Sequence, residues 1–168
     1  MPLDAAPLID DGMRELERLR LRQLQTVQGA GELAAFTTDG CSGNLSSGWR
    51  LLAASLPGFA DGFGDRPPWE DCCVAHDRSY WRGGAIDGYA SRLRADEALR
   101  KCVLLRGNEL APALAARHSV GEARVRQTFA LIADLMYDAV RFGGQPCTLL
   151  PWRWGYGWPR CAFAEIEP

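Results

Sequence analysis

The sequence predicts a mainly helical domain stabilised by disulfide bonds, and three observations lead to this prediction. Apolar residues recur at helical spacing in long stretches near both ends of the chain. Residues 71–80 place two adjacent cysteines, a histidine and an aspartate in one short helical stretch. Six cysteines among 168 residues are enough for three disulfide bonds. We therefore expect a single domain over residues 1–168, with an N-terminal helical segment (1–35), a loop and two paired helices (36–106), and a supporting helix with an aromatic tail (107–168).

The first expected helix runs from Leu8 to Gln28. Its apolar residues follow helical intervals among acids and arginines, namely Leu8, Met13, Leu16, Leu19, Leu24 and Val27. We interpret this segment as a packing helix, and an interfacial role is the alternative.

A polar segment, Thr37 to Asn44, follows this helix and surrounds Cys41. A long connection rich in glycine and proline then runs from Leu45 to Trp69, a length typical of a functional loop or lid. Its aromatic side chains either fill the core beneath the loop, which we favour, or line an entry to the site. The side chains in question are Phe59, Phe63 and Trp69.

The stretch from residue 71 to residue 80 carries the most specific pattern of the chain. On a helix, residues four apart share a face. Cys72 and His76 therefore form one stripe, and Cys73 and Asp77 form a second stripe about 100° round the axis. If the two cysteines are bonded to different neighbours, His76 faces one neighbour and Asp77 faces the other. Such an arrangement holds a base beside a metal ligand.

A second helix is expected over residues 89–106, after a glycine-rich turn so short that the two helices run antiparallel. In such a pair, a bridge from Cys72 to Cys102 would bring Asp96 to within ~3 Å, along the axis, of the position that faces His76. Asp96 and Cys102 lie about 120° apart on their own helix, so both contacts require a broad face. Six cysteines allow many pairings, and the register favours this bridge without excluding the others.

Cys41 offers the second stripe a partner. A bridge from Cys41 to Cys73 would lay the backbone carbonyls around Cys41 beside the Asp77 carboxylate. Carbonyls, a carboxylate and water are the ligands of a hard cation, and calcium accepts such irregular oxygen cages better than magnesium does. The residues therefore indicate a calcium site.

The last expected helix runs from Glu122 to Arg141 and ends at a pair of glycines. Its single apolar stripe, which would support the other helices, consists of Val125, Phe129, Ile132, Met136 and Val140. Beyond it, aromatic residues occupy every second position from Trp152 to Trp158, so an extended tail would present four rings on one face. We interpret the tail as a cover on the helices, with Cys147 bonded to Cys161, and a membrane-contact patch is the alternative.

The central part of the chain resembles the secreted phospholipase A2 family. The run Cys72-Cys73-Val74-Ala75-His76-Asp77, followed by Tyr80 and then by Asp96 and Cys102, is similar to the motif of that family. The run Asp39-Gly40-Cys41-Ser42-Gly43 resembles its calcium loop, in the form seen in bacterial members. Many members carry a second glycine where this chain has Ser42, and Asn44 stands where they carry a third. Asn44 is a residue that tolerates a left-handed backbone.

This resemblance implies calcium-dependent hydrolysis of the sn-2 ester of glycerophospholipids at a membrane or micelle surface. His76 would take a proton from the attacking water, Asp96 would hold the other imidazole nitrogen, and Tyr80 would hydrogen-bond Asp96. Asp77 would bind Ca²⁺ together with backbone carbonyls. Aligned on Cys41, these carbonyls belong to Gly40, Ser42 and Asn44.

Two other functions fit parts of the pattern. A non-catalytic module that binds lipid or protein with calcium would use the same scaffold and would not need His76. A hydrolase with Cys72 or Cys73 as its nucleophile and His76 as its base would need a free thiol.

Composition and charge limit the remaining functional classes. A net charge of −2 gives no electrostatic argument for binding nucleic acid. No run of about 20 apolar residues suggests a membrane span. Disulfide bonds predict an oxidising location, secreted or periplasmic, although the first residues show neither the basic nor the apolar segment of a signal peptide.

Overall fold

The computed structural model describes residues 5–41, 66–84 and 87–161. Within these ranges the chain forms helices α1 (Ala5–Ala30), α4 (Glu70–Arg82), α5 (Gly88–His118) and α6 (Glu122–Gly143), and no strand. The prediction of a mainly helical, disulfide-linked domain is confirmed. The predicted ligands Ser42 and Asn44, and the aromatic residues Phe59 and Phe63, lie outside the described residues.

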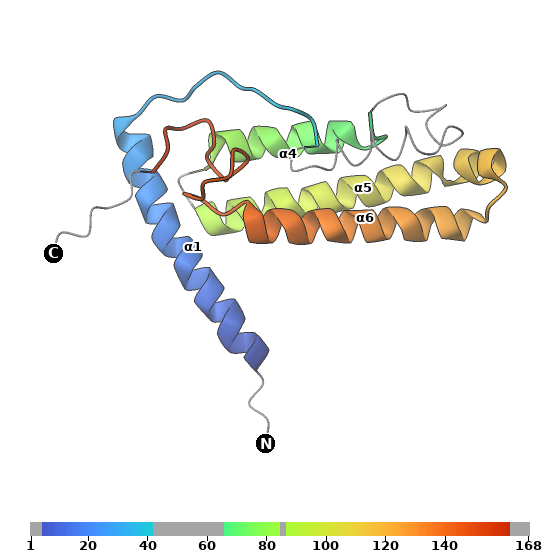
Figure 1. Ribbon diagram of the computed structural model, residues 1–168, viewed down its shortest axis with the longest axis horizontal. Coiled ribbons are helices and arrows are strands. Elements are labelled where there is room, and N and C mark those ends of the chain that lie inside the picture. Colours follow the sequence, from blue (N-terminus) through green and yellow to red (C-terminus); the bar gives the residue numbers. More distant parts are fainter. Residues whose placement is uncertain (1–4, 42–65, 85–86, 162–168) are drawn as a thin grey trace.

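Helices α4 and α5 run antiparallel, as the short turn between them predicts (Figure 1). Helix α4 has acids in its first turn and an arginine in its last, which suits the helix dipole. It ends at Gly83, whose φ of 56° is left-handed and whose N–H donates to the carbonyl of Ser79. Glycine adopts this conformation without the steric penalty of a side chain, so the chain can turn sharply into α5.

Helices α5 and α6 form a long antiparallel pair (Figure 1), and α5 extends well beyond its expected end at Arg106. The reason is tertiary. A Cβ on Gly107 would lie 2.4 Å from the Cβ of Phe129, so this glycine lets α6 approach instead of ending α5. Between α4, α5 and α6 lies a core that includes Trp69, whose ring meets Phe129 edge to face at 5.6 Å. Trp69 therefore fills the core, as the favoured interpretation expected.

Helix α1 leaves the bundle at a steep angle, and its N-terminal end points away from the other helices (Figure 1). Leu21 and Leu24 are buried in a second core with Tyr80, Ala95 and Trp154. Leu16 and Leu19, which belong to the expected apolar stripe, are instead exposed. The packing interpretation thus holds for the C-terminal half of the expected stripe, where α1 meets the end of the bundle. None of the helices in the described ranges is long and apolar enough to cross a membrane.

Three disulfide bonds tie the elements together, joining Cys41 to Cys73, Cys72 to Cys102 and Cys147 to Cys161. The bridge favoured by the helix register, Cys72 to Cys102, is among them. The adjacent cysteines of α4 therefore bond to different neighbours, one to α5 and the other to the segment before residue 42.

Candidate functional site

Helix α4 presents both predicted stripes to the interior. Cys72, Cys73, His76, Asp77 and Tyr80 are all buried. The bond to Cys102 holds the first stripe against α5, and the bond to Cys41 holds the second stripe against the preceding segment. The helical period thus separates two chemical environments that are one residue apart in the sequence.

The first stripe brings His76, Asp96 and Tyr80 together. His76 Nε2 lies 2.8 Å from Asp96 Oδ1, and the Tyr80 hydroxyl donates to the same oxygen at 2.7 Å. The two rings are 4.1 Å apart between centroids. Burial raises the pKa of Tyr80 well above its ordinary value, so the phenol stays protonated and serves as a donor. Since a carboxylate only accepts, Nε2 carries the imidazole proton and Nδ1 remains to take up another.

The second oxygen of Asp96 has partners that the sequence analysis missed. Arg141 Nη1 donates to Oδ2 at 2.9 Å, and Arg92 Nη1 lies 3.5 Å from the same atom. Glu17 from α1 receives two hydrogen bonds of 2.6 Å from the Arg92 guanidinium. The spacing of Arg92, four residues before Asp96, was a local signal for one of these contacts. No local signal points to Arg141 or Glu17.

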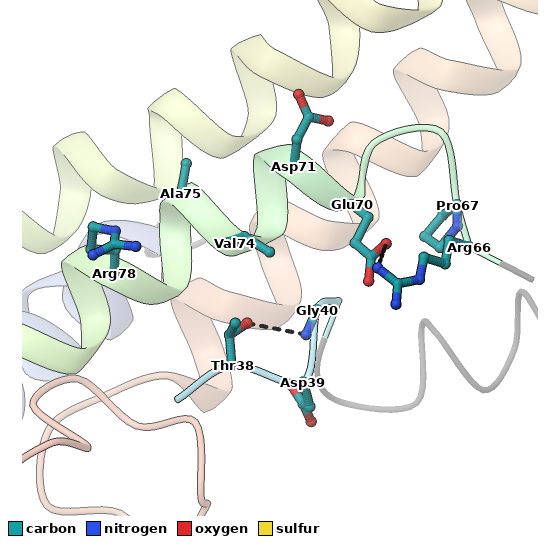
Figure 2. Close-up of a pocket in the computed structure, with 10 residues that line it drawn as sticks. All are labelled: Thr38, Asp39, Gly40, Arg66, Pro67, Glu70, Asp71, Val74, Ala75 and Arg78. Carbon is teal, nitrogen blue, oxygen red and sulfur yellow. Dashed lines mark hydrogen bonds and ion pairs between the residues drawn. The ribbon is translucent and has the colours of Figure 1, made fainter. Parts of the chain in front are cut away.

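The second stripe meets the segment around Cys41. The Thr38 hydroxyl donates to Asp77 Oδ2 at 2.5 Å and accepts the Gly40 N–H at 3.1 Å. Figure 2 shows this short segment lying alongside α4, with the bond from Gly40 to Thr38 dashed. Gly40 has a φ of 78°, and a Cβ there would lie 2.5 Å from Glu70 Oε1. The left-handed φ favours glycine at this position, while the Glu70 carboxylate is the flexible end of a side chain that can move aside.

Two pockets flank this segment. The one drawn in Figure 2, of about 880 Å³, lies over the outer face of α4 and borders neither His76 nor Asp77. The smaller one, of about 280 Å³, is lined by Asp77 together with residues 37–39 and the tail residues Pro151, Trp152 and Tyr156. We place the candidate cation site in the smaller pocket because it contains the buried carboxylate.

The partners of Asp77 do not fully offset the cost of burying its negative charge. Burial raises its pKa from 3.8 to about 6, against the opposing effects of the Thr38 hydrogen bond and of His76. Asp39 adds a second negative charge nearby and raises the pKa further. A buried carboxylate beside hydroxyl and backbone oxygens is a donor set that suits a hard divalent cation. Of the predicted ligands, Asp77 lines the smaller pocket and Gly40 lines the larger one on the other side of the same segment. Ser42 and Asn44 are outside the described residues.

Another grouping of potential ligand atoms occurs in the described part of the chain. One ligand atom each of Asp71, Cys72 and Cys102 lies within 4.8 Å of the others, so this group could hold a metal ion. In the oxidised protein, however, the two sulfurs are bonded to each other, and Asp71 pairs with Arg106 at 2.5 Å. Metal binding by cysteine requires thiolates. The bond between these two sulfurs therefore weighs against metal binding by this group in the oxidised protein.

The cysteine-nucleophile interpretation is wrong. All six cysteines are in disulfide bonds and none is free. A sulfur in a disulfide has no thiolate to attack an ester. His76 therefore has no thiol to activate.

The aromatic tail covers the end of α4 and is not extended. Its backbone N–H groups at Gly155 and Gly157 donate to the carbonyls of Tyr80 and Trp81. Trp154 is buried with its ring edge-on to Tyr80. The Tyr156 hydroxyl donates to the Thr37 carbonyl at 2.6 Å. The tail thus satisfies the last carbonyls of α4 and forms one wall of the Asp77 pocket, as the cover interpretation expected.

Comparison with known proteins adds no family assignment. No family model, no curated protein and no solved structure matches this chain. The functional argument therefore depends on the geometry of the site and on the resemblance of its motifs.

Proposed function

We propose that this protein is a calcium-dependent phospholipase A2 that hydrolyses the sn-2 ester of glycerophospholipids. The observation that carries the proposal is the buried cluster of His76, Tyr80 and Asp96, in which His76 stands next to a second buried carboxylate, Asp77, whose pKa is raised. A base and a cation ligand on adjacent residues are suited to activating water and to stabilising the charge that develops on an ester oxygen.

Each residue has a defined part in this chemistry. His76 Nδ1 accepts the proton of the attacking water, while Nε2–H remains bonded to Asp96. Asp96 holds the His76 ring in the tautomer that carries its proton on Nε2, and it stabilises the imidazolium as this forms. Asp77 and the carbonyl of Gly40 would bind calcium, which supplies electrophilic stabilisation of the ester oxygen. No side chain is acylated in this scheme.

On this proposal, the protein works in an oxidising compartment, and its partner is a phospholipid surface. Three disulfide bonds persist in secreted or periplasmic proteins. Mixed-chain phosphatidylcholine vesicles or micelles are the natural test substrate because they report which ester is cut.

The first prediction concerns hydrolysis itself. We expect fatty-acid release from the sn-2 position to require calcium and to fall by ~10²–10⁴-fold in His76→Gln, because the general base is lost. Asp77→Asn should lower calcium affinity and activity together. Fatty-acid release with and without a chelator measures both effects.

Matched controls are available within the chain. His118→Gln changes the other histidine, and Asp71→Asn changes an exposed acid on the same helix. Neither control should lower activity. Calcium-dependent lipid binding without hydrolysis in the wild type would favour the non-catalytic module. Full activity in His76→Gln would contradict the mechanism, and release from sn-1 would contradict the positional assignment.

A further inference from the structure

The carboxylate of Asp96 is held on both of its oxygens. Oδ1 accepts hydrogen bonds from His76 and Tyr80. Oδ2 accepts one from Arg141 at 2.9 Å, and Arg92 Nη1 lies 3.5 Å from it. A carboxylate offers about four lone-pair directions, and four donor groups lie within 3.5 Å of its two oxygens. A carboxylate that is bonded in this way has no freedom to rotate away from the imidazole.

Of the two arginines that hold Asp96, Arg92 is fully buried and Arg141 is partly exposed, and both are paired with acids. Arg92 and Asp96 have no exposed surface, and Glu17 is 2 % exposed. Glu17 binds Arg92 through both of its oxygens and lies 3.5 Å from Arg141 Nη2. Two acids thus balance two guanidinium groups in the interior. Removing one member of such a cluster leaves a buried charge without its partner, which is strongly unfavourable.

The cluster also joins three helices at one point. Arg92 on α5 donates to the carbonyls of Val140 and Arg141 in the last turn of α6. The Val140 carbonyl also accepts the N–H of the C-cap residue Gly144 at 2.9 Å, so Arg92 adds a side-chain donor to the end of α6. Arg141 lies over the ring of Tyr89, 5.4 Å from its centroid. Glu17 adds α1 to the same junction, where Arg14 of α1 also lies over the ring of Tyr89, 5.9 Å from its centroid.

We propose that Arg92, Arg141 and Glu17 are positioning residues that orient Asp96, so that helix α1 takes part in holding the active tautomer of His76. This inference rests on the proposed function for its kinetic consequence only. Arg141 fixes Oδ2, Arg92 connects Asp96 to Glu17, and Glu17 neutralises the arginine pair. Their effect reaches the reaction through the orientation of the His76 ring.

A direct test reads the His76 tautomer without any substrate. In protein made with nitrogen-15-labelled histidine, at a pH well above the ordinary histidine value of ~6.5, we expect the proton of His76 to reside on Nε2. His118 is the only other histidine, and His76→Gln assigns the signals. In Arg141→Gln and in Glu17→Gln, the Nε2–H form should give way to a mixture of the two tautomers. Arg141→Lys, which keeps a charged donor, should retain more of that form.

Kinetics provide the second measurement. We expect Arg141→Gln to lower kcat by ~10-fold or more, the size seen when an outer partner of a functional imidazole is removed, while KM stays within ~2-fold. Arg141→Lys should recover part of the lost kcat. The matched control is Arg126→Gln, which removes a surface ion pair to Glu122 from the same helix and leaves Asp96 untouched.

The outcomes separate this inference from the proposed function. If the His76 tautomer depends on Arg141 but the protein does not hydrolyse phospholipid, the positioning role is sustained and the proposed function is contradicted. Normal hydrolysis with an unchanged tautomer in folded Arg141→Gln overturns the positioning role. If Arg141→Gln does not fold, Arg141→Lys decides: wild-type tautomer and wild-type kcat overturn the inference, and partial loss of both sustains it.

Discussion

At the scale of single residues, the two acids of the site differ in how completely they are satisfied. Asp96 has donors to both oxygens, including two guanidinium groups. Asp77 is also buried, and among the described residues it accepts one hydrogen bond, from the Thr38 hydroxyl. Hydrogen bonds and ion pairs within the protein therefore offset the cost of burying the charge of Asp96. For Asp77 most of this cost is not offset. This difference supports the proposals that Asp96 positions His76 and that Asp77 binds a cation.

The raised pKa of Asp77 leads to a prediction about stability and pH. Because its pKa rises from 3.8 in the unfolded chain to about 6 in the folded protein, the folded state binds a proton more tightly. In the absence of calcium, the free energy of unfolding should fall by about 3 kcal/mol as pH rises through this window, and level off above it.

Urea unfolding in the presence of a chelator measures this effect, with Asp77→Asn as the reference. The difference between the two proteins should grow between pH values of about 4 and 6, with the wild type becoming the less stable. Added calcium should reverse the sign by favouring the ionised carboxylate. A difference that stays constant over this pH range would show that burial does not perturb Asp77.

At the scale of elements, the contact between α5 and α6 depends on the missing side chain of Gly107. Helix propensity alone predicts that Gly107→Ala stabilises the protein by up to ~1 kcal/mol. Packing predicts the opposite, because the new Cβ would lie 2.4 Å from Phe129 Cβ, which cannot move without its backbone. We expect packing to dominate and the free energy of unfolding to fall by ~1–3 kcal/mol.

Gly12→Ala is the matched control for this prediction, because a Cβ on Gly12 meets nothing within 4 Å. It should leave stability unchanged or raise it slightly. Denaturant unfolding of both variants gives the comparison. If Gly107→Ala is as stable as the wild type, α6 is able to shift away from α5 without loss.

The elements also show where local patterns predict well. The periodicity of residues 122–141 locates α6 to within two residues of its observed end, since its apolar stripe faces the core throughout. The end of α5 was predicted too early because Gly107 is a packing contact and Pro112 is accommodated inside the helix. Whether a glycine ends a helix or admits a neighbour is decided by the neighbour, which a local pattern does not contain.

At the scale of the whole molecule, the disulfide bonds have separable tasks. The bridge from Cys41 to Cys73 spans 32 residues and the bridge from Cys147 to Cys161 spans 14. Loop entropy predicts that removing either one by paired serine substitution costs about 3–4 kcal/mol. Of the two, the first bridge directly links the segment that carries Thr38 and Gly40 to helix α4 beside Asp77.

We therefore expect the two double variants to lose similar stability but to differ in calcium binding. Removal of the Cys41–Cys73 bridge should lower calcium affinity by ~10-fold or more, whereas removal of the Cys147–Cys161 bridge should change it little. Titration with calcium, monitored by isothermal calorimetry, measures the difference. Equal affinities in both variants would show that the segment before residue 42 does not contribute to the site.

The sequence by itself determined the relations that lie within one helix. Cys72 and His76, and Cys73 and Asp77, are four residues apart, and the helical period alone places them on two faces. The approach of Asp96 to His76 also followed from spacing, because a short turn and a disulfide bond restrict how two helices can be aligned.

The tertiary structure alone decided the surroundings of these residues. Arg141 and Glu17 lie 124 positions apart in the chain and meet at Asp96 only because α1, α5 and α6 converge there. Thr38 meets Asp77 across 39 positions, and the tail turns back onto α4 instead of extending. Such contacts depend on how helices pack and where buried charges find partners, and the local periodicity of the sequence carries no information about either.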